Sequence, residues 1–166
     1  IWCGAVRRLA LMHYDFHYST VTFTPSNTSP RVNVIQFELS SALMPVMQFS
    51  ASPWRVLPEA DFQKVKAALA LREKCLPEIF KAVECAKVTG EPIVRSMEFV
   101  FPGQGMERVM DQFMVGEDLL VAPVWKQGEV ARSVRLPEGQ WRCVGLGETE
   151  GDVLNGGRDV ILGENE

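Results

Sequence analysis

Two sets of side chains have the residue types of a hydrolytic site. Ser50, His13 and Asp111 could supply a nucleophile, a base and an orienting acid, but the sequence around Ser50 does not form the tight turn that exposes a nucleophile. Glu107 and Asp111 stand four residues apart and could form a pair of catalytic carboxylates. Two acids at that spacing more often form one solvated helix face. These residues alone therefore do not indicate an active site.

The cysteines and histidines do not have the spacing of a metal site. No Cys-x-x-Cys pair occurs, and both histidines are close in sequence only to the first cysteine, so a zinc ion would have an incomplete ligand set. Cys75 and Cys85 are ten residues apart on an expected helix, a rise of about 15 Å that a disulfide cannot span. We expect buried thiols and no metal. The residues considered are Cys3, Cys75, Cys85, Cys143, His13 and His17.

Two glycine pairs, Gly103-x-Gly105 and Gly145-x-Gly147, have part of the pattern of a nucleotide-binding loop. The first pair lacks the third glycine and does not open a helix after a buried strand, so a dinucleotide site is not indicated. The sequence also contains no Gly-Lys-Ser/Thr phosphate loop. We interpret both pairs as turns.

The composition limits the class of protein. The 166 residues are 46% hydrophobic and 23% charged, with a formal net charge of −4, which is typical of a folded globular chain. Because Lys and Arg do not cluster, we expect no nucleic-acid partner and no binding to anionic membranes. No run approaches the ~18 to 20 apolar residues of a membrane span. Since the sequence begins at Ile1, we also expect a piece of a longer protein.

The first 36 residues differ in character from the rest. They carry a formal charge of +2, from Arg7, Arg8 and Arg31 against Asp15, which leaves −6 for the remaining 130 residues. No sustained helical or strand period runs through the segment. We therefore place residues 1–36 outside any domain, and expect them to be disordered or the product of an incorrect gene model.

A strand followed by a long helix is expected next. Leu39–Phe49 suits a strand that is buried on both faces, although Pro45 would remove one ladder hydrogen bond. From Glu59 to Val88 the apolar residues follow a helical stripe, which predicts an amphipathic helix with a kink near Pro77. Gly90 stands just beyond this helix, as a helix-ending glycine would.

After Gly90 the sequence changes to short apolar or alternating runs, separated by Gly, Pro and acidic turns. This pattern is typical of an antiparallel β-sandwich. A short helix is expected at Gln104–Met110 between two of the strands. The predicted strands are Pro92–Phe101, Asp118–Trp125, Ser133–Leu136, Trp141–Val144 and Val160–Leu162.

A series of motifs runs through the same region. They are Met44-Pro45-Val46-Met47-Gln48-Phe49-Ser50, Pro53-Trp54-Arg55, Gly90-x-Pro92-Ile93-x-Arg95, Asp111-Gln112-Phe113-x-x-Gly116, Leu120-Val121-Ala122-Pro123-Val124 and Leu136-Pro137-x-Gly139-x-Trp141. In order and spacing they resemble the end of the catalytic barrel, the joining segment and the proximal β-sandwich of the family 31 glycoside hydrolases. The likeness extends over residues 37–161.

The resemblance implies an α/β fold followed by an all-β fold. Residues 37–90 would be strand eight and helix eight of a (β/α)8 TIM barrel, and residues 91–166 an incomplete antiparallel β-sandwich. Family members hydrolyse terminal α-linked sugars with retention and without a cofactor, using an Asp nucleophile and an Asp acid/base from earlier barrel strands. Neither motif occurs here, so we assign no catalytic residue and expect the isolated chain to be inactive.

The resemblance also suggests two substrate-binding residues. Where α-glucosidases of the family have Arg-Asn-His at the end of strand eight, this chain has Gln48-Phe49-Ser50. Gln48 could bind sugar hydroxyls, and Trp54, in the loop that follows, could offer an apolar face to a sugar ring. Alternatively, Gln48 caps the strand end and Trp54 is a packing aromatic. The expected partner is a carbohydrate, an α-glycoside.

Two other functions stay open at this point. The first is a non-catalytic member of the same fold, a pseudoenzyme or carbohydrate-binding protein, which the absence of both Asp motifs upstream would indicate. The second is a stand-alone β-sandwich interaction module. It is disfavoured because the helix at Glu59–Val88 would then expose its apolar stripe.

Overall fold

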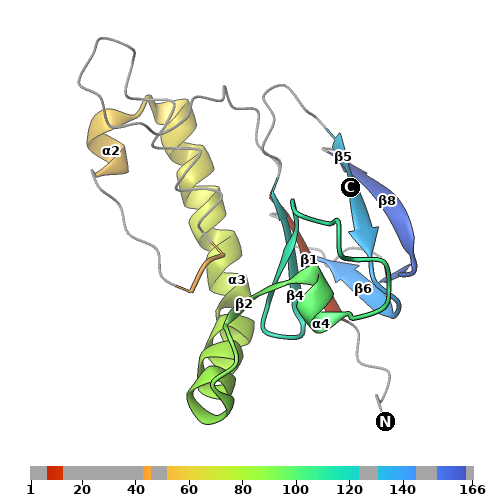
Figure 1. The fold of residues 1–166 in the computed structure, drawn as a ribbon. Coiled ribbons are helices and arrows are strands. Elements are labelled where there is room, and N and C mark those ends of the chain that lie inside the picture. The colour runs from red at the N-terminus through yellow and green to blue at the C-terminus, as the bar shows by residue number, and fades with distance from the viewer. Residues whose placement is uncertain (1–6, 13–42, 46–51, 124–130, 145–152, 164–166) are drawn as a thin grey trace, which may run out of the picture.

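The computed structural model describes residues 7–12, 43–45, 52–123, 131–144 and 153–163. Within these residues, helix α3 (Glu59–Thr89) lies on one side of a six-stranded sheet and a two-stranded sheet lies on the other (Figure 1). The larger sheet has the spatial order β2 (Val94–Ser96), β3 (Phe113–Val115), β4 (Leu119–Pro123), β1 (Arg7–Met12), β6 (Gln140–Cys143) and β7 (Val153–Asn155). The smaller sheet pairs β5 (Ala131–Leu136) with β8 (Arg158–Gly163), and the short helices are α2 (Pro53–Val56) and α4 (Met97–Val100).

The β3–β4 hairpin separates two hydrophobic cores because side chains alternate across a strand. Val115, Leu119 and Val121 point to the α3 side. Met114, Leu120 and Ala122 point to the β5–β8 side. The core on the α3 side contains Leu43, Val65, Ala68, Leu71, Cys75, Ile79, Ala82, Val115, Leu119 and Val121. The core on the opposite side contains Met97, Phe101, Met106, Met114, Leu120, Ala122, Val134, Leu136, Trp141 and Leu162. Strands β2 to β8 all follow residue 90, which confirms the expected sheet-rich C-terminal region.

Helix α3 agrees closely with the helix predicted at Glu59–Val88. Its buried residues recur every three or four positions, which is the spacing of one helix face. Gly90 ends the helix with a φ of 76°, and its N–H donates to the carbonyl of Ala86 at 2.8 Å. Glycine adopts this left-handed conformation without the steric cost of a Cβ. The helix continues through Pro77, and the expected kink there stays a prediction.

Strand β1 corrects the expectation for the first 36 residues. Arg7–Met12 lies between β4 and β6 and runs parallel to both, although we expected no regular structure there. The prediction failed because a six-residue strand whose partners lie more than a hundred residues away leaves little local signal. The other residues of this segment lie outside the described part of the chain.

Several local expectations were also wrong. Only Leu43–Pro45 of the expected strand at 39–49 is described, and these three residues form a turn whose Met44 carbonyl accepts a hydrogen bond from Arg72 at 2.6 Å. The rest of that strand lies outside the described residues and stays a prediction. The strand expected at Pro92–Phe101 is the short strand β2 followed by α4, which Ser96 caps by accepting from the Phe99 N–H. No helix forms at Gln104–Met110, where the chain makes turns. Trp54 lies in α2 rather than in a loop.

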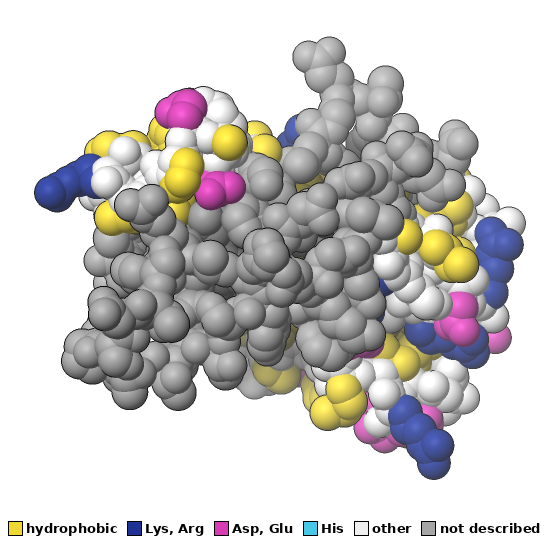
Figure 2. Space-filling view, turned by 90° about the horizontal axis from the view of Figure 1, so that it is seen from above, with side chains coloured by type: hydrophobic (Ala, Val, Ile, Leu, Met, Phe, Trp, Pro, Cys, Tyr) yellow, Lys and Arg dark blue, Asp and Glu magenta, His cyan; other side chains and the backbone are white. Residues whose placement is uncertain are grey.

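Figure 2 shows the molecule from above. On the coloured, described part of this face, Lys and Arg side chains lie among Asp and Glu side chains and do not form a patch of one charge. None of the helices in the described residues has both the length and the hydropathy needed to cross a membrane.

Candidate functional site

An open pocket lies where α3 meets β2 and the turn between β3 and β4. Its volume is about 390 Å³ when the space at its mouth is included. The floor is apolar and the rim carries charges of both signs. The lining residues are Glu78, Lys81, Ala82, Cys85, Arg95, Val115, Gly116, Glu117 and Asp118.

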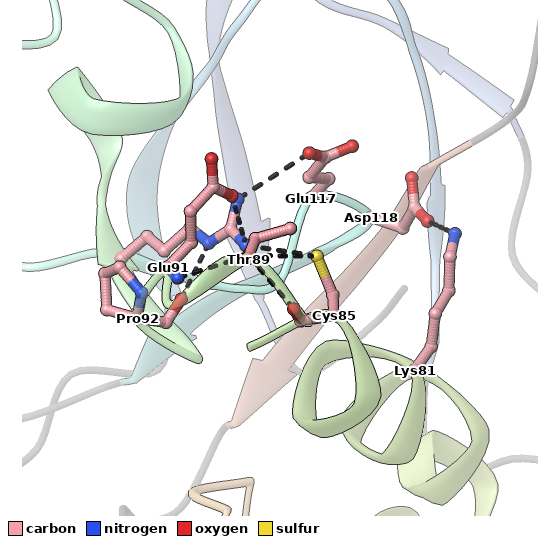
Figure 3. Close-up of polar contacts among 8 residues, drawn as sticks. Lys81, Cys85, Thr89, Glu91, Pro92, Glu117 and Asp118 are labelled. Atoms are coloured by element: carbon pink, nitrogen blue, oxygen red, sulfur yellow. Dashed lines mark hydrogen bonds and ion pairs between the residues drawn. The ribbon is translucent and has the colours of Figure 1, made fainter. Parts of the chain in front are cut away.

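Arg95 lies in the wall of this pocket and contacts residues from several elements. Its side chain is only 3% exposed, and a charge so buried requires partners. Its Nε donates to the carbonyl of Pro92 at 2.8 Å, while its two terminal nitrogens lie 3.0 Å from Glu91 and 3.6 Å from Glu117 (Figure 3). The Sγ of Cys85 on α3 is 4.0 Å from Arg95 Nη2. The guanidinium thus ties β2 to the helix end and to the hairpin turn.

A second ion pair closes the rim of the pocket. Lys81 on α3 donates to Asp118 in the turn just before β4 (Figure 3). The hydrogen bond to Asp118 and the charge of that carboxylate raise the pKa of Lys81 above 10.5. Because the Lys81 side chain is 71% exposed, this pair contributes little to stability.

Gly116 sets how closely the helix approaches the hairpin. Its φ is 62°, and a Cβ at this position would lie 3.0 Å from the Cβ of Ala82 on α3. The Gly116 N–H also donates to the carbonyl of Ile93 at 2.8 Å. A larger residue would therefore push α3 away from the sheet.

The charged residues of this pocket pair with one another, so the pocket is a structural joint that connects α3, β2 and the turn between β3 and β4. Asp118 pairs with Lys81, and Glu91 and Glu117 pair with Arg95. No group of three or more His, Cys, Asp or Glu side chains within the described ranges could hold a metal ion. No arrangement of nucleophile and base is formed by the lining residues.

A second polar cluster joins the start of β3 to β5. The Gln112 side chain donates to the Arg135 carbonyl at 3.0 Å and accepts from the Arg135 N–H at 2.8 Å, as a neighbouring strand would. Asp111 accepts from the buried Arg132 guanidinium at 2.5 Å. Asp111 therefore has a structural role.

Residues 90–158 match the glycosyl hydrolase family 31 C-terminal domain. This part of the chain belongs to the family 31 glycosyl hydrolases. The chain is 38% identical over 103 residues to the myogenesis-regulating glycosidase of Mus musculus, and 36% identical over 111 residues to an alpha-glucosidase of Saccharolobus solfataricus. These matches cover 61% and 66% of this chain but only 14% and 15% of the two relatives.

A solved structure supports the same relationship. The chain resembles a family 31 alpha-xylosidase from a soil metagenome, solved with xylose, with a TM-score of 0.65 and 28% identity. That likeness covers 78% of this chain and 22% of the xylosidase. The chain thus spans a small part of the proteins to which it is similar.

Of the two residues predicted to bind substrate, the structure describes only Trp54. Gln48 lies outside the described residues, as do His13 and Ser50. Trp54 stands on α2 with 66% of its surface exposed, and it does not line the pocket. Its exposure leaves the ring accessible, so its role as a substrate platform stays a prediction.

Arg95 was not among the residues predicted from the sequence to form a site. A charge at the end of the motif Gly90-x-Pro92-Ile93-x-Arg95 was a usable signal, because a charge on a short strand between apolar segments must be paired where it is buried. Its partners Glu117 and Cys85 come from other elements, and local spacing does not identify them.

Proposed function

We propose that this chain is the C-terminal end of the catalytic region of a retaining α-glycosidase. Residues 37–90 would supply the last strand and helix of a TIM barrel, with α3 as the helix, and residues 91–166 would begin the proximal sandwich. Arg7–Met12, which pairs with β4 and β6, would be a further strand of that sandwich, and the rest of residues 1–36 has no domain assignment.

The observation that carries this proposal is the match of residues 90–158 to a family 31 C-terminal domain directly after a 31-residue amphipathic helix. In a (β/α)8 barrel each strand is followed by such a helix, and the active site lies at the C-terminal ends of the strands. A barrel needs ~250 residues, which agrees with the small share of its relatives that this chain spans.

The proposed catalytic carboxylates lie outside this chain. Retention requires two carboxyl groups ~5 Å apart, one attacking the anomeric carbon and the other protonating the leaving oxygen. Asp111 and Asp118 are both engaged with basic side chains. The chain alone would therefore not hydrolyse a glycoside, and the complete enzyme would need no cofactor.

Gln48 and Trp54 are the substrate contacts that we propose for this chain. Gln48 would stand at the mouth of strand eight, where its amide can both donate to and accept from sugar hydroxyls. Trp54 would present its ring to the C–H face of a sugar. The proposed substrate class is a terminal α-linked glycoside.

The test compares this chain with the complete protein translated from the same gene. We expect the complete protein to release nitrophenol from an aryl α-glycoside, and NMR to detect the α-anomer as the first product. The 166-residue chain at the same concentration is the control, and it should release none. Inversion of configuration would contradict the retaining mechanism.

A complete protein that binds sugars but lacks both catalytic Asp motifs would instead be a non-catalytic member of the family. Isothermal titration with the same glycosides would then detect binding without turnover. Activity of the 166-residue chain that disappears when one of its own carboxylates is mutated would contradict the proposal directly.

A further inference from the structure

We propose that the gap between β4 and β6 is an acceptor site for an extended peptide strand, filled here by Arg7–Met12 of the same chain. This inference does not depend on the glycosidase assignment. It concerns how the sandwich is completed by a segment from a distant part of the sequence.

The direction of β1 indicates that it is a separate addition to the sheet. It pairs in parallel with β4 over five residues and with β6 over three. The β2–β3, β3–β4 and β6–β7 pairs are all antiparallel, and a short turn at residues 116–118 joins β3 to β4. A parallel strand must arrive through a long connection, and β1 precedes β4 by more than a hundred residues.

The burial of β4 explains why this site needs an occupant. Leu119, Leu120, Val121 and Ala122 are fully buried. Such a strand cannot leave the N–H and C=O groups of one edge without partners, because buried backbone polar groups are almost always paired. Without β1, the facing edges of β4 and β6 would each require another strand.

The family match separates the acceptor from the occupant. Residues 90–158 include both β4 and β6, whereas Arg7–Met12 lies outside them. The two acceptor edges therefore belong to the family 31 domain, and the strand between them is supplied from elsewhere. The ligand class is an extended peptide held by main-chain hydrogen bonds, as in other cases of strand addition.

The occupant has the composition of a strand. Residues 7–12 read RRLALM, without Pro or Gly and with four apolar residues in succession. In a parallel pairing, successive residues direct their backbone groups to opposite neighbours. Leu9 and Ala10 together therefore serve both β4 and β6, which makes them the positions to test.

The experiment uses the full chain with Leu9→Pro and Ala10→Pro combined, because proline removes the N–H from both sides of β1. Leu9→Val with Ala10→Ser is the matched control that keeps both N–H groups. We expect hydrogen exchange to become at least about tenfold faster at residues 119–123 and 140–143 in the proline variant only. Exchange in the β5–β8 pair should stay unchanged.

A synthetic peptide of residues 5–14 should then fill the vacated site. We expect it to restore slow exchange at residues 119–123 in the proline variant, and to bind that variant at least about tenfold more tightly than the unaltered chain, where the tethered strand competes. A peptide with the same two prolines should not bind. Failure of the unmodified peptide to bind or protect a folded proline variant would overturn the proposal.

A proline variant that also loses protection in β5 and β8 would have unfolded, and the unaltered chain then decides. Nuclear Overhauser contacts between the backbones of Ala10 and Val121, which are register partners, are the expected result. Their absence, or their appearance only between differently labelled copies in a dimer, would overturn the assignment to the same chain.

Discussion

The Cα of Gly116 faces the Cβ of Ala82 so closely that a methyl group on Gly116 would lie 3.0 Å from it. Gly116 also has a positive φ of 62°. Two physical requirements, a left-handed backbone and the absence of a side chain, therefore coincide at one residue. This coincidence fixes the distance between α3 and the β3–β4 hairpin.

Gly116→Ala should destabilise the chain by more than the left-handed conformation alone explains. That conformation costs an L-residue about 1 to 2 kcal/mol, and overpacking against Ala82 adds about 1 to 3 kcal/mol. Gly103→Ala is the matched control, because Gly103 has a φ of 76° but a Cβ added there would meet no atom within 4 Å. Urea unfolding measures both. Equal losses of stability would mean that the contact with Ala82 relaxes freely.

Arg95→Met should lower the free energy of unfolding by about 1 to 3 kcal/mol, because the Pro92 carbonyl and the two glutamates lose a buried donor. Both glutamates are about half exposed and can be solvated, which limits the effect. Arg135→Met, which breaks an exposed ion pair with Asp159, is the control and should cost at most about 1 kcal/mol. A smaller loss of unfolding free energy in Arg95→Met than in Arg135→Met would argue against a structural role for Arg95 in connecting β2, α3 and the hairpin turn.

The ion pair of Lys81 and Asp118 should make stability depend on pH in the alkaline range. The pKa of Lys81 is raised in the folded protein above 10.5 by Asp118. The folded state therefore holds the proton more tightly than the unfolded state, and the stabilisation is complete below pH 10.5 and is lost as pH rises through the folded pKa.

The measurement for this pair is the difference in unfolding free energy between the unaltered chain and Lys81→Met, from about pH 9 to about pH 12. The difference should be about 0.2 to 1 kcal/mol at the lower pH and should shrink toward the higher pH. A difference that grows with pH would have the wrong sign for this pair.

In a complete enzyme, Gln48→Ala and Trp54→Ala should affect catalysis more than folding. Losing one neutral hydrogen bond to a sugar hydroxyl costs about 0.5 to 1.5 kcal/mol, which lowers kcat/KM about two- to tenfold. Trp141→Ala should instead cost about 3 to 5 kcal/mol of stability, because Trp141 is fully buried and its indole N–H donates to the Pro137 carbonyl at 2.9 Å. Phe113→Ala should likewise lower stability more than it lowers catalysis. Measuring kcat/KM and the thermal midpoint of all four variants separates substrate-binding residues from packing residues. If Gln48→Ala and Trp54→Ala lower the midpoint but leave kcat/KM intact, Gln48 and Trp54 are packing residues.

The sequence predicted the elements whose signal is local. The stripe along α3 and the apolar runs at β4, β5, β6 and β8 each repeat over several residues, so their periodicity identified them. Strands β3 and β7 have only three residues each, too few for a period to appear. Strand β1 depends on partners at the other end of the chain, which no local pattern encodes.

The candidate site was less predictable than the fold. Arg95 gathers partners from the helix end and the hairpin turn, so its role follows from tertiary structure rather than spacing. Gln48 and Trp54 were derived from the family resemblance. Trp54 lies on a helix instead of the expected loop, since Pro53 suits the first position of a helix.

Because the β3–β4 hairpin contributes side chains to both hydrophobic cores, melting of one core must disturb the other. The described helix and sheets should therefore unfold in a single cooperative transition, with equal calorimetric and van't Hoff enthalpies. The family match begins at residue 90, but the residues before and after this boundary would then unfold together. Truncation there would remove one wall of the remaining sandwich rather than release an independent domain.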